Sequence, residues 1–457
     1  MQSAALFWND VALEANKEDH TNTPQEAGGP TYSARALALA HAAMADAFTN
    51  AHRADGGKAP FKPAFTEHLP PGRALPAAAI GVAAHAVLSF IHKRQQPFFN
   101  ASLTTFVQQL AGANQQAVQG GLAFGKTVAQ AILDRAATDG SNDPTNSNNR
   151  SGYVPGGLNG MHAPDPLNPG QGYYGWHYGN VRPMALERRD ALAALAALPP
   201  PPPQTHEKRY LKDYVEVYRD GRKPEPRSRP TDEQVRVGIF WAYDGVKGIG
   251  TPPRLYNQIL REVGKADGLS EAEWVVLLAQ ANIAMSDAGI VAWQAKFLYN
   301  VWRPIVGVRQ HVEISGRSDE QQDPNWEPLG APASNGSNNG KDFTPPFPAY
   351  PSGHATFGAA CFTALKRFRQ QRNHRADPDR IDIKFVSDEL NGITTDADGV
   401  TVRPRIEQHF RSIDAMIEAN LVSRVLLGVH WRFDGDGGKE SGVKVGQQVA
   451  DTLYRKH

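Results

Sequence analysis

Residues 347–362 read Phe347-Pro-Ala-Tyr-Pro-Ser-Gly-His354-Ala-Thr-Phe-Gly-Ala-Ala-Cys-Phe362. The second half of this stretch is small and apolar, which favours a buried helix, and the first half is a loop that leads into it. Ser352 is a good N-cap after Pro351, and Gly353 lets a ligand approach the backbone. The N-terminus of a helix attracts oxyanions, so His354 is placed to act there as a proton donor. Alone, Ser-Gly-His is a weak pattern.

Two further segments carry cations in apolar surroundings. Lys296 and Arg303 lie seven residues apart in a segment, 272–302, that is predicted to be one long buried helix ended by Pro304. Seven residues are nearly two turns, so the two side chains are expected to share a face, roughly 10 Å apart along the axis. Further on, Arg424 and His430 lie at the end of a helix predicted for 405–430, which Gly428 loosens.

Taken one at a time, these residues would be read as solvated charges and a packed histidine. However, Lys296 and Arg303 are surrounded by tryptophan, phenylalanine and leucine, and Arg424 lies in a run of leucine and valine. A buried cation needs an anionic partner, because an unpaired buried charge is very costly. Neither short motif contains an acidic residue, so the cations are expected to bind an anion.

The three segments together resemble a known signature. Lys-x6-Arg-Pro, Pro-Ser-Gly-His and Ser-Arg-x5-His, in this order, are similar to the three-part motif shared by vanadium-dependent haloperoxidases and type 2 acid phosphatases. Other stretches resemble the chloroperoxidase branch in particular, strongly from about residue 236 onward. These are Phe240-Trp-Ala-Tyr-Asp-Gly245, Ile249-Gly-Thr-Pro-Pro-Arg254, Ser286-Asp-Ala-Gly-Ile290 and Gly428-Val-His-Trp-Arg-Phe-Asp434.

The resemblance implies a vanadate site, with one vanadate per chain. Lys296, Arg303 and Arg424 would meet its oxygens, and the Ser352 hydroxyl and the Gly353 N–H would add donors. His430 would be the single histidine ligand of the metal. In a phosphatase the same histidine would be the nucleophile that takes the phosphoryl group.

Four more roles follow from the resemblance. His354 would act as acid and base, and Lys296 would polarise bound peroxide. Asp244 would pair with Arg424. Trp293 and Phe347 occupy the positions that border the halide site in fungal-type chloroperoxidases, and Phe347 matches the chloride-oxidising pattern.

Composition excludes several classes of partner. Lys plus Arg number 48 against 47 Asp plus Glu, so no global charge favours nucleic acid or an anionic membrane. The single cysteine, Cys361, is expected to be a buried thiol. The apolar stretch 74–91 is expected to be a core helix, and the lack of several strong spans points away from integral-membrane lipid phosphatases. No signal peptide is visible, so a cytoplasmic location is expected by default, with secretion by another route left open.

The predicted fold class is all-α, because no stretch shows the sustained alternation that a sheet needs. The resemblance implies two packed four-helix bundles with long irregular loops and the active site in the C-terminal bundle. The expected division is an N-terminal helical half at 1–203, a linker at 204–235, and a C-terminal bundle at 236–457. Helices are predicted at 6–15, 33–50, 77–93, 102–115, 118–137 with a break near 120, 191–198, 231–242, 252–261, 272–302, 355–372, 381–393 and 405–430.

The loop 139–183 is rich in glycine, asparagine and proline, as linkers often are, but it contains many aromatic residues. We therefore expect it to pack over the mouth of the site.

Three functions compete. The leading one is a haloperoxidase that oxidises chloride or bromide with hydrogen peroxide, with an organic acceptor as a further partner. The alternative is an acid phosphatase that works through a phosphohistidine in the same pocket. The third is an oxyanion-binding or storage protein. The sequence leaves halide preference, organic substrate, oligomeric state and any phosphatase activity of the vanadate-free form open.

Overall fold

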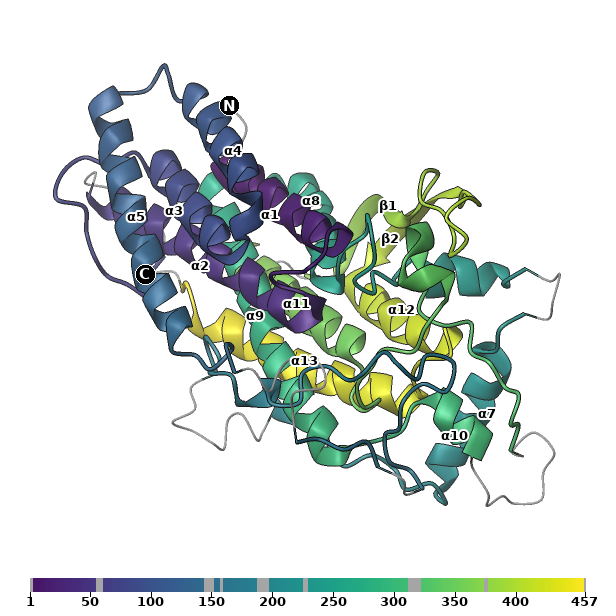
Figure 1. Ribbon diagram of the computed structural model, residues 1–457. Coiled ribbons are helices and arrows are strands. Elements are labelled where there is room, and N and C mark those ends of the chain that lie inside the picture. Colours follow the sequence, from purple (N-terminus) through teal and green to yellow (C-terminus); the bar gives the residue numbers. More distant parts are fainter. Residues whose placement is uncertain are drawn as a thin grey trace.

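The computed structural model describes residues 3–54, 61–143, 152–156, 159–186, 197–224, 229–310, 322–373 and 377–455. Within them the chain is mainly helical, as predicted (Figure 1). The helices of the first half are α1 (Ala4–Thr21), α2 (Gly29–Ala54), α3 (Pro76–Ile91), α4 (Gln96–Gln108) and α5 (Gln115–Ala137). The helices of the second half are α7 (Lys208–Asp220), α8 (Pro252–Ala266), α9 (Glu271–Tyr299), α10 (Pro304–Gln310), α11 (Gly353–Asn373), α12 (Ile413–Leu426) and α13 (Arg432–Thr452).

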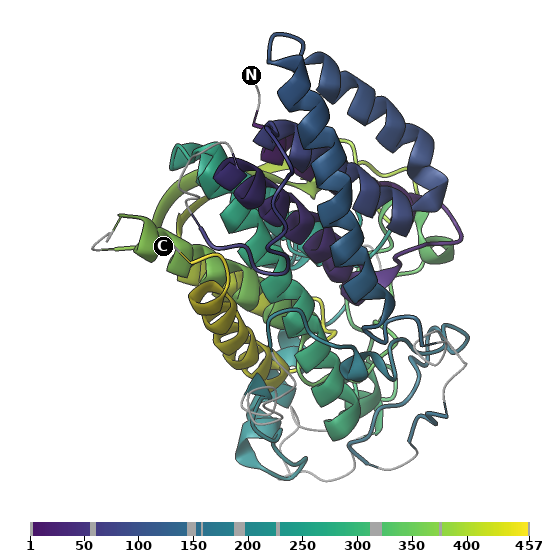
Figure 2. The same ribbon diagram turned by 90° about the vertical axis from the view of Figure 1, so that its left-hand side faces the viewer.

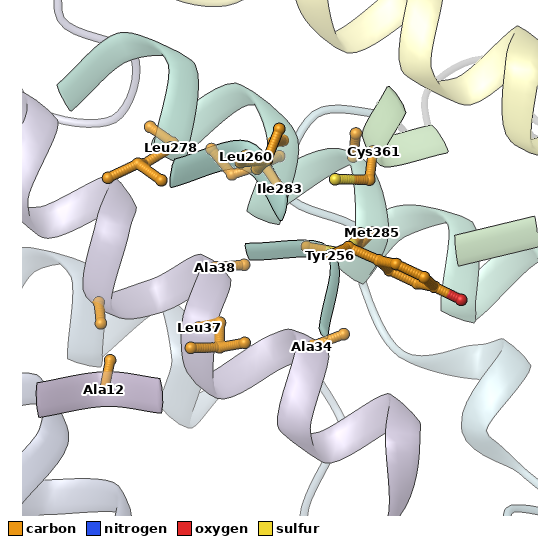
Figure 3. Close-up of a cluster of buried hydrophobic side chains, with 14 of the residues drawn as sticks. Ala12, Ala34, Leu37, Ala38, Tyr256, Leu260, Leu278, Ile283, Met285 and Cys361 are labelled. Carbon is orange, nitrogen blue, oxygen red and sulfur yellow. The ribbon is translucent and has the colours of Figure 1, made fainter. Parts of the chain in front are cut away.

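Helix α9 is the centre of the core. It begins with a capping box, in which Ser270 and Glu273 satisfy each other's backbone N–H groups. It packs against α2, α11 and α13. By length and composition α9 could cross a membrane, but its apolar window is wholly buried inside the protein. Side chains from α1, α2, α8, α9 and α11 meet in one apolar cluster that includes Cys361 (Figure 3), so the expected buried thiol is confirmed.

A row of glycines lets α13 lie directly against α11. A Cβ atom at Gly442 would lie 2.4 Å from the carbonyl oxygen of Thr356, and one at Gly438 would lie 2.7 Å from that of Ser352. Because no side chain fits in either place, the two backbones approach closely. The N-terminal end of α13, which follows His430, is thereby held against the Pro-Ser-Gly-His loop. Figure 2 shows α11 and α13 side by side in a second view.

The helix predicted for 381–393 is wrong. Residues Arg380–Asn391 form strand β1, which pairs antiparallel with β2 (Arg405–Ser412). Ile381, Ile383 and Phe385 do alternate with charged residues, but the buried face continues with the polar Ser387 and Glu389, which weakens the apolar period. The first part of the helix predicted for 405–430 is wrong for the same reason, and α12 begins only after Ser412, whose side chain caps it.

The break predicted near residue 120 is also absent. Helix α5 runs unbroken through Gly120 and Gly121, where Cβ atoms would lie 2.1 Å and 2.5 Å from the carbonyl oxygens of Arg73 and Leu75. These glycines serve close packing of α5 on α3 and not a turn.

The stretch 204–235 contains α7, with Tyr210 and Tyr214 buried against Trp431, so this part of the predicted linker packs into the fold. The domain boundaries and the arrangement as two four-helix bundles stay predictions. The helix expected at 231–242 is a single π-helical stretch, Gln234–Ile239. The one expected at 191–198 lies mostly outside the described residues.

Candidate oxyanion site

The first motif folds differently from the single helix that its spacing predicted. Helix α9 ends at Tyr299, and Asn300 takes a left-handed conformation (φ 52°) that closes it. Arg303 therefore lies in the connecting segment before α10, not on a helical face shared with Lys296. The two cations still converge, because the Lys296 Nζ and the Arg303 Cζ each lie 4.9 Å from the centre of the Phe347 ring.

Lys296 is buried and donates to three carbonyl oxygens of the Pro-Ser-Gly-His loop. The Nζ distances are 2.8 Å to Pro348, 3.1 Å to Ala349 and 2.5 Å to Pro351. Burial, together with the charge of Arg303, lowers the pKa of Lys296 well below its usual value. Among the described residues no carboxylate lies within ion-pair distance of this ammonium, which carbonyl dipoles solvate, while the more distant charge of Asp434 favours its ionised form.

Arg303 joins the first motif to the other two. Its Nε donates to the carbonyl oxygen of Phe347 at 2.9 Å, and its Nη1 donates to that of Val429 at 2.8 Å. Its Nη2 is buried with no hydrogen-bond partner. Burial and the nearby charge of Arg424 lower the pKa of Arg303 to about 9, although Asp434 opposes them.

Arg424 forms the ion pair expected with Asp244. Its Nη1 and Nη2 lie 3.0 Å and 2.7 Å from the two carboxylate oxygens, and both side chains are buried. Its Nε is buried without a partner. The pair thus fixes one edge of the guanidinium and leaves another N–H free for a ligand.

His430 lies in the turn between α12 and α13, and not in the helix predicted to continue to it. Gly428 takes a φ of 68°, a left-handed conformation that suits glycine, and turns the chain. The ring Nδ1 lies 2.9 Å from the Asp434 carboxylate, and the ring Nε2 lies 2.9 Å from Arg303 Nη1. Since a guanidinium only donates, Nε2 is the acceptor and Nδ1 carries the proton. Burial and the charge of Arg303 lower the pKa of His430 well below its usual value.

Asp434 was missed by the sequence reasoning. It also accepts the backbone N–H of Trp431, and its own carbonyl oxygen accepts the N–H of Ser352 at 2.8 Å. It therefore ties the third motif to the second. Burial raises the pKa of Asp434, whereas the charges of Lys296 and Arg303 favour its ionised form. Its place four residues after His430, at the start of a helix, was the signal that could have identified it.

The second motif begins α11 at Gly353. Ser352 is buried, and its hydroxyl oxygen lies 3.5 Å from the N–H of Ala355, a weak cap that leaves the hydroxyl for other partners. His354 Nε2 donates to the carbonyl oxygen of Ala242 at 2.5 Å and lies 3.9 Å from Asp244. Burial and the charge of Arg424 lower the pKa of His354 to about 3, so its ring is neutral.

Part of this group lines a cavity of about 960 Å³. The polar lining residues include His354, His430, Arg424, Asp244 and Gly353 from the site, together with Gln25 and Glu26, whereas Lys296, Arg303 and Ser352 are buried behind the lining. The apolar lining comes from Tyr32, Tyr174, Trp293, Phe343, Phe347 and Phe357. The rings of Trp293 and Phe347 are 4.9 Å apart, so the two residues expected at a halide site are neighbours in this wall.

Of the described residues of the long loop, Tyr174 lines the cavity. Tyr174 packs against Trp293 at 6.0 Å and Phe347 at 6.3 Å, which confirms that part of 139–183 covers the site. Trp176 instead stacks on Tyr153 at 4.9 Å and is not part of the lining.

The residues present fit a small oxyanion. Three cations, Lys296, Arg303 and Arg424, face two carboxylates, Asp244 and Asp434, so positive charge is in excess when the histidines are neutral. Two buried guanidinium nitrogens lack partners. An anion with several oxygens would supply both the missing charge and the missing acceptors.

Comparisons with known proteins agree with this geometry. Residues 2–169 match the family model of the vanadium chloroperoxidase N-terminal domain, and residues 276–457 match that of the VCPO second helical-bundle domain. Vanadium chloroperoxidase of Curvularia inaequalis is 32% identical over 530 aligned residues, which cover 98% of this chain and 84% of the relative.

Solved structures show the same fold. A bacterial vanadium-dependent iodoperoxidase superposes with a TM-score of 0.73 at 19% identity, covering 97% of this chain and 95% of that one. The holo form of a bacterial vanadium-dependent chloroperoxidase gives a TM-score of 0.68 at 16% identity, covering 95% of each chain.

The helical fold and the cationic pocket define a protein that holds a small oxyanion. The chain belongs to the vanadium-dependent haloperoxidase family, whose cofactor is vanadate.

Proposed function

We propose that this protein oxidises chloride or bromide with hydrogen peroxide at a vanadate that is held by His430. The observation that carries the proposal is the state of the His430 ring. Its Nε2 is unprotonated and accepts a hydrogen bond from Arg303, whose place a metal would take, and Asp434 accepts the hydrogen bond of the protonated Nδ1. An imidazole in this state is ready to ligate a metal, and the carboxylate behind it fixes the ring.

When bound, vanadate supplies a Lewis-acidic centre at which peroxide is activated towards the halide. Arg303 and Arg424 offer their unpartnered N–H groups to its oxygens, and the Ser352 hydroxyl and Gly353 N–H complete the donors. The Lys296 ammonium would donate to an oxygen of the oxyanion and would polarise peroxide there. It lies 4.9 Å from the centre of the Phe347 ring, which lines the cavity.

His354 acts as the acid and base. Its pKa lies near 3, because of burial and Arg424, so the ring is a neutral base at ordinary pH. An anion bound against Arg424 would offset that charge and raise the pKa of His354 toward a range useful for proton transfer. Ala242 fixes the ring through its Nε2, which leaves Nδ1 to take the proton of hydrogen peroxide.

Trp293 and Phe347 form the halide site. Their rings make an apolar wall beside the cations. A halide at this wall loses its hydration water but is still attracted by the positive charges. The sequence relative is a chloroperoxidase, and Phe347 matches the chloride-oxidising pattern, which supports chloride as well as bromide as substrate.

An organic acceptor is the third partner. A halide and a peroxide fill only a small part of the cavity of about 960 Å³. Sites of roughly 300–1,000 Å³ with aromatic walls are typical of drug-sized ligands. The same pocket could hold phosphate with His430 as nucleophile, because Asp434 would orient the ring equally well for that reaction. A cytoplasmic location stays a prediction.

Halogenation of monochlorodimedone tests the function. We expect turnover with bromide and chloride that requires both peroxide and added vanadate and that inorganic phosphate suppresses. A parallel assay follows hydrolysis of p-nitrophenyl phosphate by the vanadate-free protein. Strong hydrolysis without halogenation would establish the phosphatase instead, and the absence of both activities would leave an oxyanion-binding protein.

A further inference from the structure

A second group of possible ligands lies away from His430 and the cation cluster. One atom each of Asp19, Glu26 and His92 lies within 4.8 Å of the other two. Asp19 is in the last turn of α1, Glu26 is in the segment between α1 and α2, and His92 directly follows α3. Three separate segments therefore bring an imidazole and two carboxylates to one point.

The His92 ring is the unusual member of this group. The residue is only 3% exposed, and its buried Nδ1 has no hydrogen-bond partner among the residues that the structure describes. The atom lies 3.8 Å from the Asp19 carboxylate, whereas a hydrogen bond between nitrogen and oxygen needs about 2.7–3.2 Å. A buried imidazole nitrogen that lies 3.8 Å from the Asp19 carboxylate without bonding it, in a group that also contains the Glu26 carboxylate, points to a missing partner among the three side chains.

Both carboxylates retain free lone pairs. The Asp19 oxygens accept the backbone N–H groups of Glu26 at 2.8 Å and Ala27 at 2.9 Å. The Glu26 oxygens accept the backbone N–H of Arg94. Each carboxylate offers about four acceptor positions, so one per residue remains for a cation.

Arg94 is the competing positive charge. Its Nε lies 4.0 Å from Glu26, and its side chain is 46% exposed. Solvent screens a charge at such a position, and the side chain can turn away. Its pairing with Glu26 does not explain the unpartnered nitrogen of His92.

We propose that Asp19, Glu26 and His92 bind a divalent transition-metal ion of the zinc class. Imidazole and carboxylate are ordinary ligands of Zn²⁺, whereas Ca²⁺ and Mg²⁺ prefer oxygen ligands alone. Ligands about 2.1 Å from a tetrahedral ion lie roughly 3.4 Å from each other, close to the 3.8 Å between His92 and Asp19. Glu26, which is half-buried, closes the third position, and water takes the fourth.

The ion would join α1, α3 and the wall of the catalytic cavity. Glu26 lines that cavity together with Pro24, Gln25 and Gly28. A bound cation holds this segment in place and offsets the negative charge of Glu26 beside a cavity that receives anions. The ion site stands independently of the function proposed above, because none of its three ligands is among the residues that would hold vanadate.

A simple ion pair between a protonated His92 and Asp19 is the rival explanation. This explanation predicts that Zn²⁺ does not bind here, because a protonated imidazole cannot be a metal ligand and the ion pair is not stabilised by Zn²⁺. Binding of the metal to defined side chains therefore separates the two.

The test is calorimetric titration of Zn²⁺ into the untagged, vanadate-loaded protein, so that the histidines of the vanadate pocket are occupied. Co²⁺ absorption then reports a low-coordinate nitrogen and oxygen site. We expect one equivalent to bind and the melting temperature to rise. Glu26→Gln and His92→Gln should each weaken binding at least about tenfold. His85→Gln is the matched control, because His85 lies seven residues earlier in α3 and bonds Asn100.

Arg94→Gln should not weaken Zn²⁺ binding, in contrast to Glu26→Gln and His92→Gln. Removal of the competing charge should leave Zn²⁺ binding equal or tighter, whereas it would matter little to an ion pair of His92 with Asp19. Unchanged binding in Glu26→Gln and His92→Gln, or no binding of Zn²⁺, Co²⁺ or Mn²⁺ by the native protein, overturns the proposal. Glu26 is half-buried, so its variant will fold even if His92→Gln does not.

Discussion

Asp434 and His430 are joined by a hydrogen bond of 2.9 Å in which the ring Nδ1 donates to a carboxylate oxygen. The bond keeps the proton of the ring on Nδ1 and so leaves Nε2 unprotonated. The backbone carbonyl of the same aspartate accepts the N–H of Ser352. Asp434 therefore positions both the His430 ring and the Pro-Ser-Gly-His loop.

Asp434→Asn should weaken vanadate binding by about 10–100-fold, because an amide orients the ring but does not support it with negative charge. The dissociation constant is measured from the vanadate dependence of halogenation and by calorimetry. Asp436→Asn is the control, since Asp436 is a surface residue paired with Arg209. Equal affinity in the native protein and in Asp434→Asn would show that the carboxylate has no part in vanadate binding.

Gly442→Ala should destabilise the protein by about 1–3 kcal/mol. Alanine favours helices, but its Cβ would lie 2.4 Å from the Thr356 carbonyl and push α13 from α11. Because that contact also aligns Asp434 with Ser352, vanadate affinity should fall as well. Chemical denaturation measures the first effect. Gly112→Ala, where a Cβ meets nothing within 4 Å, should change neither quantity; comparable losses in both variants would contradict the packing explanation.

Phe347→Leu should lower kcat/KM for chloride more than for bromide, by roughly tenfold or about 1.4 kcal/mol. The ring faces both Lys296 and Arg303 at 4.9 Å, and chloride holds its water more tightly than bromide, so it depends more on a dry aromatic wall. Steady-state kinetics with each halide measure the ratio. Phe343→Leu, in the same cavity, is the control. A parallel loss for both halides would place the halide elsewhere.

His41 provides a pH test outside the site. It is buried, its Nδ1 donates to the carbonyl oxygen of Leu37, and burial lowers its pKa from 6.5 to about 4. The unfolded chain takes up this proton below about pH 6.5 while the folded one does not until about pH 4, so the contribution of His41 to stability is lost as pH falls through that window. Relative to His41→Gln, native stability should drop by about 2–4 kcal/mol between pH 7.5 and 4. A constant difference would show that the pKa of His41 is the same in the folded and the unfolded protein.

The strongest sequence predictions rested on charged residues, because a charged side chain is costly to bury without a partner. Lys296, Arg303 and Arg424 had no acidic neighbour in sequence, and the structure brings them together around Phe347 and His430. Their charge predicted that they bind an anion, and the resemblance to the family signature predicted that they meet at one site, whereas neither predicted the path of the chain between them. The left-handed Asn300 ends α9 four residues after Lys296, and no spacing rule reports such a local stop.

The polar residues on buried faces were the main source of error. Glu389 lies on the inner side of β1, where Arg403 and Ser334 satisfy it, and those partners are distant in sequence. When these two partners are not known, the sequence of the strand is typical of an amphipathic helix. Asp434 was overlooked for a related reason, because a carboxylate at the start of a helix is ordinarily a cap, although its spacing of four residues from His430 was visible in the sequence.

The content of bound vanadium tests the central claim most directly. Native protein, His430→Ala and His354→Ala are incubated with vanadate, desalted, and assayed for vanadium per chain. One equivalent should remain on the native protein, a smaller but measurable amount on His354→Ala without turnover, and essentially none on His430→Ala. Retention of vanadium by His430→Ala equal to that of the native protein would contradict a site built on that histidine.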